Sequence, residues 1–468
     1  MKLPLTMQRC TLPFVVAAFL LCNEAMGQVQ PGPTFTVTDL GDYSDGACTT
    51  DDCTLRDALI AANADPDANT IDFAAGLSGT ISLDRFNPFT ASHLAISAPV
   101  TIIGPGARLV AIDGASLVRV FFVDSADVSI SGLTITNGNP FNANGGAILN
   151  QGNLTLTACT ISNSKTSDSS GGNGGGLFNG SNATASLVDC TISGNTAESF
   201  GGGVYNDGTF SATNCTFSGN TALRGGGLIS RFNGGVSSST ILNCTITNNT
   251  ASSTGAGIGD GGGGYFAEGG PQQHSVGNSI IAGNTNSINP DVRGQFTSSG
   301  NNLIGSSGSS STGFVNEENG DKVGTNLEPL SAEFGSFANH GGPTNTWSIL
   351  DLSPAKDGGN DALAPLADQR GHARVDASDM GAFEFGSSGL RITGFARVGN
   401  DFVFEFREAV AGSSYGLERK FDLTEADWVP DPDFAPFTAI ANGNYSFIYT
   451  DGAVLHLPPV FYRLVLIP

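Results

Sequence analysis

The stretch Cys159-Thr160-Ile161-Ser162 decides the fold, because close copies of it return further along the chain. The copies are Cys190-Thr191-Ile192-Ser193, Cys215-Thr216-Phe217-Ser218 and Cys244-Thr245-Ile246-Thr247. Successive copies begin 31, 25 and 29 residues apart. A repeat of roughly 20 to 50 residues is the signature of a solenoid, in which each copy packs on its neighbours.

Each copy has the alternation of a β-strand, with Cys and Ile or Phe on one face and Thr and Ser on the other. The residues between copies are rich in Gly, Ser, Asn and Thr, which are poor helix formers, so an α-helical solenoid is excluded. The 64 glycines suggest a disordered linker as the alternative. Linkers do not carry a β-branched pattern in a constant phase, so we predict an all-β chain that forms a parallel β-helix.

In such a coil, like residues stack at the strand spacing of about 4.8 Å. We expect Cys159, Cys190, Cys215 and Cys244 to form one ladder of buried thiols in the core. An asparagine recurs three residues after each inward apolar residue, where stacked amides can hydrogen-bond along the coil. These asparagines are Asn195, Asn220, Asn249 and Asn284. Glycine clusters between the copies supply corners that need positive φ or close backbone approach.

Residues 1–27 have the features of a secretory signal peptide, with Lys2 and Arg9 before an apolar stretch from Leu12 to Leu21. No later apolar run is long enough to cross a membrane, so we expect no membrane span in the mature chain and an exported, extracellular or cell-surface location. The net charge of −23 repels polyanions. Nucleic acid is therefore excluded as a partner, because its binding needs basic patches.

The remaining cysteines have two different roles. Cys48 and Cys53 lie close together in a polar stretch, and export favours a disulfide between them. The four ladder cysteines are too far apart in sequence for a zinc signature, so we predict no metal site. We expect no cofactor; calcium is the candidate cation, but pairs such as Asp65 and Asp67 lack the full ligand series.

The stretch Cys53–Asn63 is the best helix of the chain, with Thr54 as N-cap and Asp57 completing an approximate capping box. One amphipathic helix before a solenoid suits the open end of the coil, which it can cover. Alternating Phe402, Phe404 and Phe406 begin a C-terminal region that we expect to be a small β-sandwich. The domains predicted are a signal peptide at 1–27, an N-terminal cap at 28–69, the parallel β-helix at 70–299, its C-terminal end at 300–386, and the β-sandwich at 387–468.

Three stretches resemble known families. Cys53-Thr54-Leu55-Arg56-Asp57-Ala58 resembles the CSLREA-type N-terminal region of exported bacterial proteins. Residues 300–386 resemble the choice-of-anchor Q region, for example at Asp379-Met380-Gly381-Ala382-Phe383-Glu384, although Trp347 and Lys356 depart from its pattern. Residues 141–148 resemble the repeats of polymorphic outer-membrane autotransporters. These resemblances imply a right-handed, pectin-lyase-like parallel β-helix and imply little about activity.

The sequence leaves the catalytic residues unknown. A polysaccharide lyase would need a basic residue beside acidic calcium ligands, and a glycoside hydrolase would need two carboxylates roughly 5 to 9 Å apart. Asp189 and Asp207 are the pair that neighbouring rungs would bring together, or they cap turns. A charged group near the C-terminal end of the coil is expected to be an ion-pair network that closes that end. Its members are Asp368, Arg370, Arg374, Asp376, Asp379 and Glu384.

The outward face of the repeated strands is a two-column array of hydroxyl groups over five rungs. Its members are Thr134, Thr136, Thr160, Ser162, Thr191, Ser193, Thr216, Ser218, Thr245 and Thr247. Such a face suits a repetitive polymer or ice, although the preference of Thr for exposed strands explains it without any ligand and is the favoured explanation. We expect an exported cell-surface or secreted β-helix protein that acts in adhesion or glycan contact through its extended outer face, without assigned catalysis. The expected partner is a polysaccharide or cell-surface polymer. A lyase or hydrolase and an ice-binding or structural module remain the alternatives.

Overall fold

A computed structural model provides the structure of the chain. It describes residues 28–83, 93–167, 172–231, 237–253, 261–269, 273–374 and 377–387, together with the strands of the C-terminal region. The predicted signal peptide at residues 1–27 lies outside the described residues. Among the described residues, no helix is both long and apolar enough to cross a membrane.

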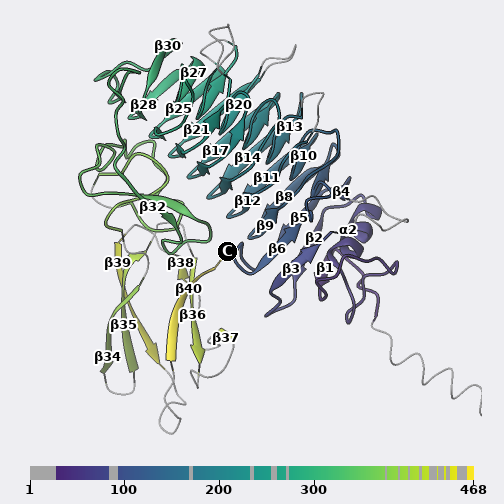
Figure 1. Ribbon diagram of the computed structural model, residues 1–468. Helices are drawn as coiled ribbons and strands as arrows, with labels where there is room; N and C mark the ends of the chain where they lie inside the picture. The colour runs from purple at the N-terminus through teal and green to yellow at the C-terminus, as the bar shows by residue number, and fades with distance from the viewer. Residues whose placement is uncertain are drawn as a thin grey trace, which may run out of the picture.

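Three parallel sheets form the body of the molecule, and the chain visits them in turn to make a β-helix, as predicted (Figure 1). Sheet 1 contains β1 (Thr34–Val37), β2 (Asn69–Phe73), β5 (Val100–Ile103), β8 (Asp127–Ser131), β11 (Asn153–Thr157), β14 (Thr184–Val188), β17 (Thr209–Thr213), β21 (Ser238–Leu242), β25 (His274–Gly277) and β28 (Thr297–Gly300). Sheet 2 contains β3 (Gly79–Ser82), β6 (Val110–Asp113), β9 (Thr134–Thr136), β12 (Thr160–Ser162), β15 (Thr191–Ser193), β18 (Thr216–Ser218), β22 (Thr245–Thr247), β26 (Ile280–Ile281), β29 (Leu303–Ile304) and β31 (Lys322–Val323). Sheet 3 contains β4 (Leu94–Ile96), β7 (Phe121–Val123), β10 (Ile148–Asn150), β13 (Leu177–Asn179), β16 (Val204–Asn206), β20 (Leu228–Ser230), β24 (Tyr265–Ala267), β27 (Val292–Gln295) and β30 (Ser307–Thr312). A further parallel pair joins β19 (Thr221–Ala222) to β23 (Thr250–Ala251) at a corner.

The core is built from the ladders that the repeats predict. In sheet 2, Ile161 lies opposite Ile192, which is followed on the next rungs by Phe217 and Ile246. All four ladder cysteines are free, and their exposed fraction is 0%. The backbone amide of each of the first three cysteines donates a hydrogen bond to the sulfur of the next cysteine along the ladder. The contact from the Cys159 amide to Cys190 Sγ, for example, is 3.4 Å long. The predicted thiol ladder is confirmed.

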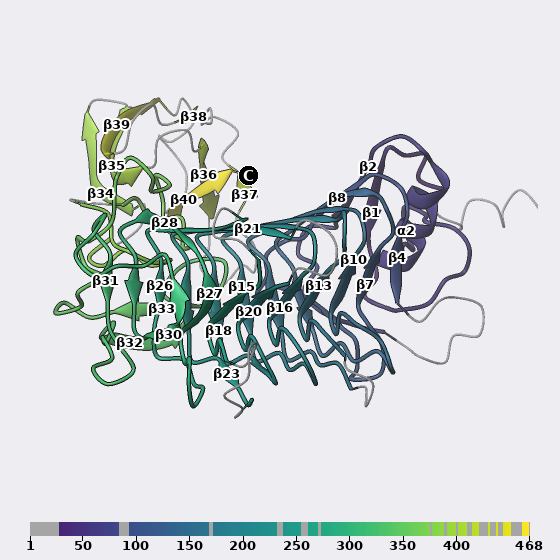
Figure 2. The ribbon, with the colours of Figure 1, turned by 90° about the horizontal axis from the view of Figure 1, so that it is seen from above.

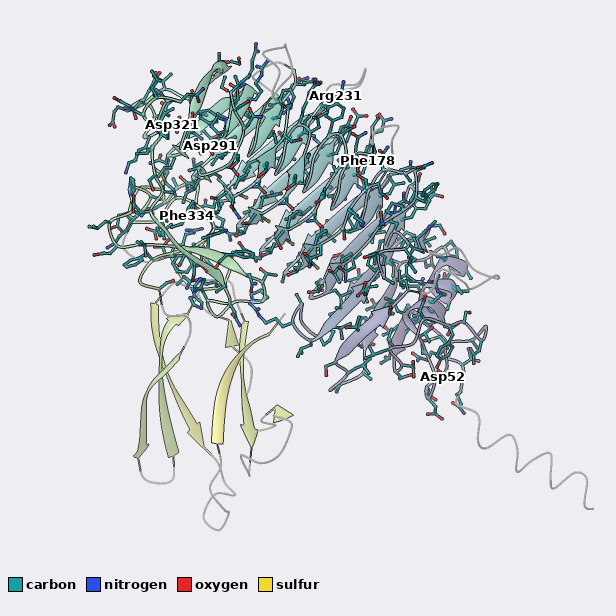
Figure 3. The ribbon with its side chains drawn as sticks, viewed as in Figure 1. Asp52, Phe178, Arg231, Asp291, Asp321 and Phe334 are labelled. Carbon is teal, nitrogen blue, oxygen red and sulfur yellow. A yellow bond between two sulfur atoms is a disulfide. The ribbon has the colours of Figure 1, made fainter. Side chains whose placement is uncertain are left out.

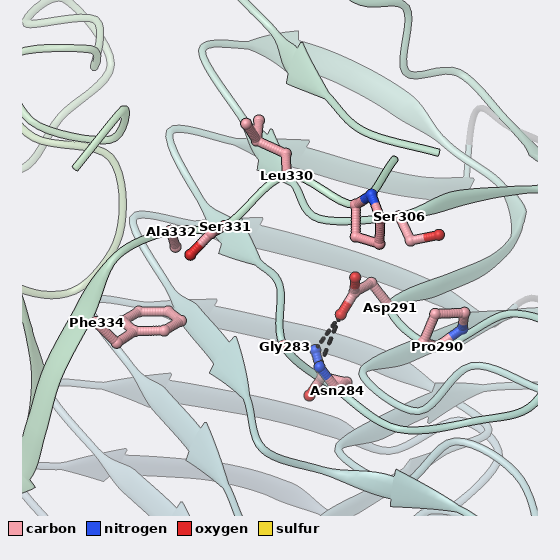
Figure 4. A pocket seen from close by; sticks show the side chains of 10 residues that line it. Gly283, Asn284, Pro290, Asp291, Ser306, Leu330, Ser331, Ala332 and Phe334 are labelled. Atoms are coloured by element: carbon pink, nitrogen blue, oxygen red, sulfur yellow. Dashed lines mark hydrogen bonds between the residues drawn. The ribbon is translucent and has the colours of Figure 1, made fainter. Parts of the chain in front are cut away.

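The asparagine ladder occupies the corner between sheets 2 and 3. The Asn195 side-chain amide donates to Asn220 Oδ1 at 3.0 Å, Asn220 donates to Asn249 at 2.8 Å, and Asn249 donates to Asn284 at 2.9 Å. The ladder ends at Asp291, whose carboxylate accepts from both the backbone and the side chain of Asn284 (Figure 4). A carboxylate has no donor to satisfy, so it can end a ladder of donors without leaving an unpaired group.

A second asparagine ladder, which the sequence analysis missed, stands at the corner between sheets 3 and 1. Asn150 donates to Asn179 at 2.7 Å, Asn179 donates to Asn206 at 2.8 Å, and all three are fully buried. Each is the last residue of its strand, so its amide can also reach the backbone of the next turn. A buried corner needs such side chains because it would otherwise leave backbone groups unpaired.

Glycine triplets before the strands of sheet 3 let neighbouring rungs approach closely. A Cβ atom at Gly202 would lie 2.5 Å from the carbonyl oxygen of Gly226 on the next rung, closer than real Cβ contacts. Gly201, the first residue of that triplet, has a φ of +68°. The repeat of glycine along the chain therefore follows from both the close approach and the backbone conformation.

The predicted helix is confirmed as α2 (Leu55–Ala64), with Thr54 as its N-cap accepting from the Asp57 amide. Its apolar face is part of the core, and α2 packs against β1, β2 and β4 at the N-terminal end of the coil (Figure 2). The predicted disulfide joins Cys48 to Cys53 just before the helix. Strand β1 pairs with β2, so sheet 1 begins within the region expected to be only a cap.

The chain then continues beyond the coil. An antiparallel pair, β32 (Phe334–Ala338) and β33 (Thr346–Ile349), belongs to a segment of residues 330–387 that we call the covering segment. The C-terminal strands form two antiparallel sheets, in keeping with the expected small sandwich. One sheet contains β34 (Arg391–Val398), β35 (Asp401–Ala409) and β39 (Gly443–Thr450), and the other contains β36 (Ser414–Lys420), β37 (Val429–Pro430), β38 (Phe437–Thr438) and β40 (Phe461–Ile467).

Candidate functional site

The hydroxyl array of sheet 2 is not an open face. Six of its ten members are buried, namely Thr136, Thr191, Thr216, Ser218, Thr245 and Thr247. The other four, Thr134, Thr160, Ser162 and Ser193, are half-buried. The expectation that these side chains form one exposed binding surface is therefore wrong. The alternation of the strand predicts which face a side chain takes, but it does not predict what packs on that face.

The covering segment lies on this array. Gln369 donates to Thr191 Oγ1 at 2.9 Å and accepts from Thr216 Oγ1 at 2.6 Å. The Trp347 indole donates to Ser218 Oγ at 2.8 Å, and the backbone amide of Ala382 donates to Thr245 Oγ1 at 3.1 Å. The hydroxyl groups thus hold a distant part of the same chain rather than an external polymer.

The charged cluster of the sequence analysis belongs to this contact. Arg370 pairs with Asp368 at 2.7 Å, and Arg374 pairs with Glu384 at 3.1 Å, with all four side chains buried. Arg374 also donates to Asn214, which lies in the corner before β18. The network therefore fastens the covering segment along the side of the coil instead of closing its end. Asp376 lies outside the described residues.

Asp189 and Asp207 do not form a pair of catalytic carboxylates. Asp189 lies between β14 and β15, at the corner of sheets 1 and 2, under the covering segment. Asp207 follows β16, at the corner of sheets 3 and 1. Burial raises the pKa of Asp189 to about 7. The interpretation of the pair as neighbouring carboxylates is wrong, because the chain visits a different corner at each residue.

The outer face of sheet 3 carries an apolar column that the sequence analysis did not identify. The middle residue of each short strand points outward and stacks in register on the middle residue of the next strand. The column is Phe122, Leu149, Phe178, Tyr205, Ile229 and Phe266. Phe178 and Tyr205 are parallel, with ring centroids 4.9 Å apart. Together with Phe200 they form an apolar cluster separate from the core.

A polar column runs beside it, formed by the residue after each strand. Its members are Asp124, Gln151, Gly180, Asp207, Arg231 and Glu268. Arg231 pairs with Glu268 at 3.1 Å and also lies over the ring of Phe200, 4.5 Å from its centroid. Figure 3 shows Phe178 and Arg231 on the same outer side of the coil.

A cavity of about 730 Å³ opens where the two columns pass Gly180. Its floor includes Leu149 and Phe178, and Gln151 and Asp207 flank it two strands apart. Two strand spacings are about 10 Å. A Cβ at Gly180 would lie 3.9 Å from Cε1 of Phe178, so any side chain there would stand in the gap beside the ring.

Asp207 is the unusual polar group of this cavity. It is 6% exposed, and its Oδ2 atom accepts from Ser181 Oγ at 2.7 Å. Its buried Oδ1 atom accepts no hydrogen bond from any residue that the structure describes. An unpaired buried acceptor costs roughly 1 to 3 kcal/mol. The carboxylate and the neighbouring Arg231 and Glu268 also set the environment of Tyr205, whose pKa is raised to about 12, mainly by burial.

Two further cavities lie among the described residues. One of about 280 Å³ adjoins the first, because Arg119 and Ala143 line both, and it also includes His93 and Phe141. The other, about 300 Å³, lies at the covering segment between Asp291 and Phe334 (Figure 4). Burial raises the pKa of Asp291 to about 6, but its carboxylate is already bonded to Asn284 and the Ser306 backbone. Of the carboxylates that line these three cavities, Asp207 is therefore the one with an unpaired oxygen.

Sequence signals for the sheet 3 site exist in the printed chain. The glycine triplets that end at Gly176, Gly203 and Gly227 are each followed by an aliphatic residue, an outward apolar residue and then Asn or Ser, as in Leu177-Phe178-Asn179 and Val204-Tyr205-Asn206. An aromatic residue at the outward position of a strand adds apolar surface to the outer face of the sheet; here Phe178 is half-buried and Tyr205 is buried. The sequence does not show that Asp207 lies beside Gly180, because that depends on the register between neighbouring strands of sheet 3.

Comparison with known proteins supports a repeat protein and no particular activity. The model of the Chlamydia polymorphic membrane protein repeat matches residues 189–207 and 214–230. No curated protein matches the chain. Among solved structures, the chain is similar to a protein described as Geobacillus virus E2 ORF18, with 11% identity over 97% of this chain and 83% of that one. The TM-score of 0.30 is too low for that similarity to carry an argument.

Proposed function

We propose that this β-helix repeat protein is exported to the bacterial cell surface or beyond and binds a glycan in the cavity on the outer face of sheet 3. The match to a polymorphic membrane protein repeat supports a surface location. The resemblances of residues 53–58 and 300–386 to CSLREA and choice-of-anchor Q regions support export, and membership of those families is part of the proposal.

The observation that carries the proposal is the combination of Phe178, Gly180 and Asp207. An aromatic ring offers a flat apolar surface for the C–H face of a sugar ring, and the missing side chain of Gly180 leaves room beside it. The Asp207 carboxylate lines the cavity and can accept a hydrogen bond from a sugar hydroxyl, and the Gln151 amide on the opposite side can donate and accept. A sugar needs this set of an apolar floor and a few convergent polar groups.

Binding is favoured over glycoside hydrolysis by the same geometry. A hydrolase places two carboxylates roughly 5 to 9 Å apart around the scissile bond. Of the residues described around this cavity, Asp207 supplies the carboxylate and Gln151 stands at the opposite flank. A lyase or hydrolase remains the alternative, and analysis of glycan products after incubation distinguishes it from a binding protein.

The test is a glycan-array screen of the purified mature chain, followed by titration of the best glycan against variants. Asp207→Asn, Phe178→Ala and Gly180→Leu should each weaken binding about tenfold or more, because they remove the acceptor charge, the floor or the free space. Asp124→Asn is the matched control: it removes a carboxylate from the same polar column at an exposed position three strands away, outside the cavity. Unchanged affinity in all three cavity variants would refute this site.

A further inference from the structure

Arg119 is a buried cation at the junction of the two cavities on sheet 3. It lies two residues before β7, and its exposed fraction is only 9%. Its Nε atom donates to the carbonyl oxygen of Gly145 at 3.1 Å, and its Nη2 atom donates to that of Asn144 at 2.7 Å. It lines both the cavity beside Phe178 and the cavity beside Phe141. Arg119 therefore lies where the two cavities meet.

No carboxylate of the described chain pairs with Arg119. Its hydrogen bonds reach two neutral carbonyl groups and leave Nη1 without a bonded residue among those described. Burial lowers the pKa of the guanidinium to about 10, and no neighbouring charge offsets that effect. A buried charge without a counter-ion is costly, and buried arginines are normally paired with an acid.

We propose that Arg119 binds an anionic substituent of the ligand, a carboxylate or a sulfate ester. This inference rests on the proposed glycan function and specifies which glycans the site selects. The planar guanidinium donates charge-assisted hydrogen bonds to either anion, and these are about twice as strong as neutral ones. The apolar side chains of Leu117, Pro140 and Phe141 line the same cavity.

The anion subsite and the Asp207 subsite are separate positions along one groove. Strands β7 and β16 are three steps apart in sheet 3, which is about 14 Å at the usual strand spacing. A ligand that reaches both residues is therefore longer than one sugar ring. The net charge of −23 repels a polyanion at long range, but that repulsion is screened beyond about 8 Å at physiological salt. For an anion in direct contact with Arg119, the attraction of the guanidinium outweighs this long-range repulsion.

His93 provides a reporter for this subsite. It lines the same cavity as Arg119, and its ring meets Phe122 edge-on with centroids 5.6 Å apart. Its pKa is lowered first by burial and then by the charges of Arg119 and Arg56. An anion bound to Arg119 should raise that pKa again, by about half a unit or more. The chain has five histidines, so its imidazole proton signals can be assigned by comparison with His93→Gln.

The experiment compares sodium sulfate, sodium acetate and sodium chloride at equal ionic strength, with NMR titration of His93. We expect sulfate, acetate or both to raise the His93 pKa saturably relative to chloride in the wild-type protein, and the two arms separate a sulfate ester from a carboxylate. Arg119→Gln should abolish the response, and Arg119→Lys should retain part of it because the charge remains. A response that is absent from the wild-type protein, or equally large in Arg119→Gln, would overturn the proposal.

The glycan array then tests the selectivity. Arg119→Gln should weaken binding of sulfated or carboxylated glycans about tenfold or more, while it leaves neutral glycans with the same backbone unchanged. Equal loss for neutral and anionic glycans would mean that Arg119 only holds the turn at Asn144 and Gly145, and would refute the anion subsite. If no glycan binds at all, the proposed function fails, and the His93 titration with inorganic ions still decides whether Arg119 is an anion site.

Discussion

Replacing Asn220 by alanine should destabilise the coil far more than replacing an exposed asparagine. Asn220 is fully buried in the middle of the ladder between sheets 2 and 3. Its side-chain amide donates to the Ile192 carbonyl oxygen at 2.9 Å and to Asn249 Oδ1 at 2.8 Å. Its Oδ1 atom accepts from both the backbone and the side chain of Asn195, each at 3.0 Å.

The magnitude follows from these four contacts. Alanine removes them all and leaves the Asn195 backbone amide without an acceptor in a buried corner. A neutral hydrogen bond contributes about 1 kcal/mol net, and an unpaired buried donor costs roughly 1 to 3 kcal/mol. Because Ile192 O and Asn249 Oδ1 can be partly satisfied by other groups, we expect a loss of about 3 to 5 kcal/mol in the free energy of unfolding.

The assay is guanidinium-induced unfolding, followed by circular dichroism, together with amide hydrogen exchange of the rungs around β15 to β22. Asn153→Ala is the matched control, since Asn153 is exposed and its side chain donates to Asp127 Oδ1 at 2.7 Å. We expect it to cost less than about 1 kcal/mol. A loss for Asn220→Ala as small as that of Asn153→Ala would refute the view that the amide ladder holds the corner.

Three further predictions follow from the buried corners. The pKa values of Asp189, Asp291 and Asp379 are raised from 3.8 to about 7, 6 and 6, chiefly by burial, so the folded chain binds more protons than the unfolded chain in this range. Their contribution to stability is complete below about pH 4 and is lost as the pH rises through 6 to 7. The melting temperature should therefore be higher at pH 5 than at pH 8. Asp189→Asn should make the difference between the two melting temperatures smaller. Gly202→Ala should cost several kcal/mol in denaturant unfolding because its Cβ would lie 2.5 Å from a carbonyl oxygen, whereas Gly180→Ala, whose nearest atom is 3.2 Å away, should be tolerated; equal losses would contradict the close-approach argument. Gln369→Ala should speed hydrogen exchange of the covering segment and of β15 and β18 without changing exchange at β7, and uniform exchange would show that Gln369 does not hold the segment.

Much of the fold is readable from the repeats, because a strand that stacks on its own copies repeats its side-chain pattern. The copies of Cys-Thr-Ile-Ser predict the inward ladder, and Asn195 to Asn249 predict the amide ladder, since both depend on residues within one turn and the next. Thr54 and Asp57 predict the start of α2 for the same reason: a helix cap is a local structure. The second amide ladder, starting at Asn150, follows the same logic but rests on single asparagines at strand ends, which are easily taken for turn residues.

The site depended on contacts that no local pattern contains. The sequence by itself determined which residues face inward along the coil, because alternation and repeat spacing require nothing beyond neighbouring turns. Only the tertiary structure decided that the Thr and Ser face is buried, because Gln369 reaches Thr191 from 178 residues away. It also decided that Asp207 stands beside Gly180 and Phe178, and that Arg119 joins two cavities without a carboxylate partner, because the register of three sheets sets those neighbours.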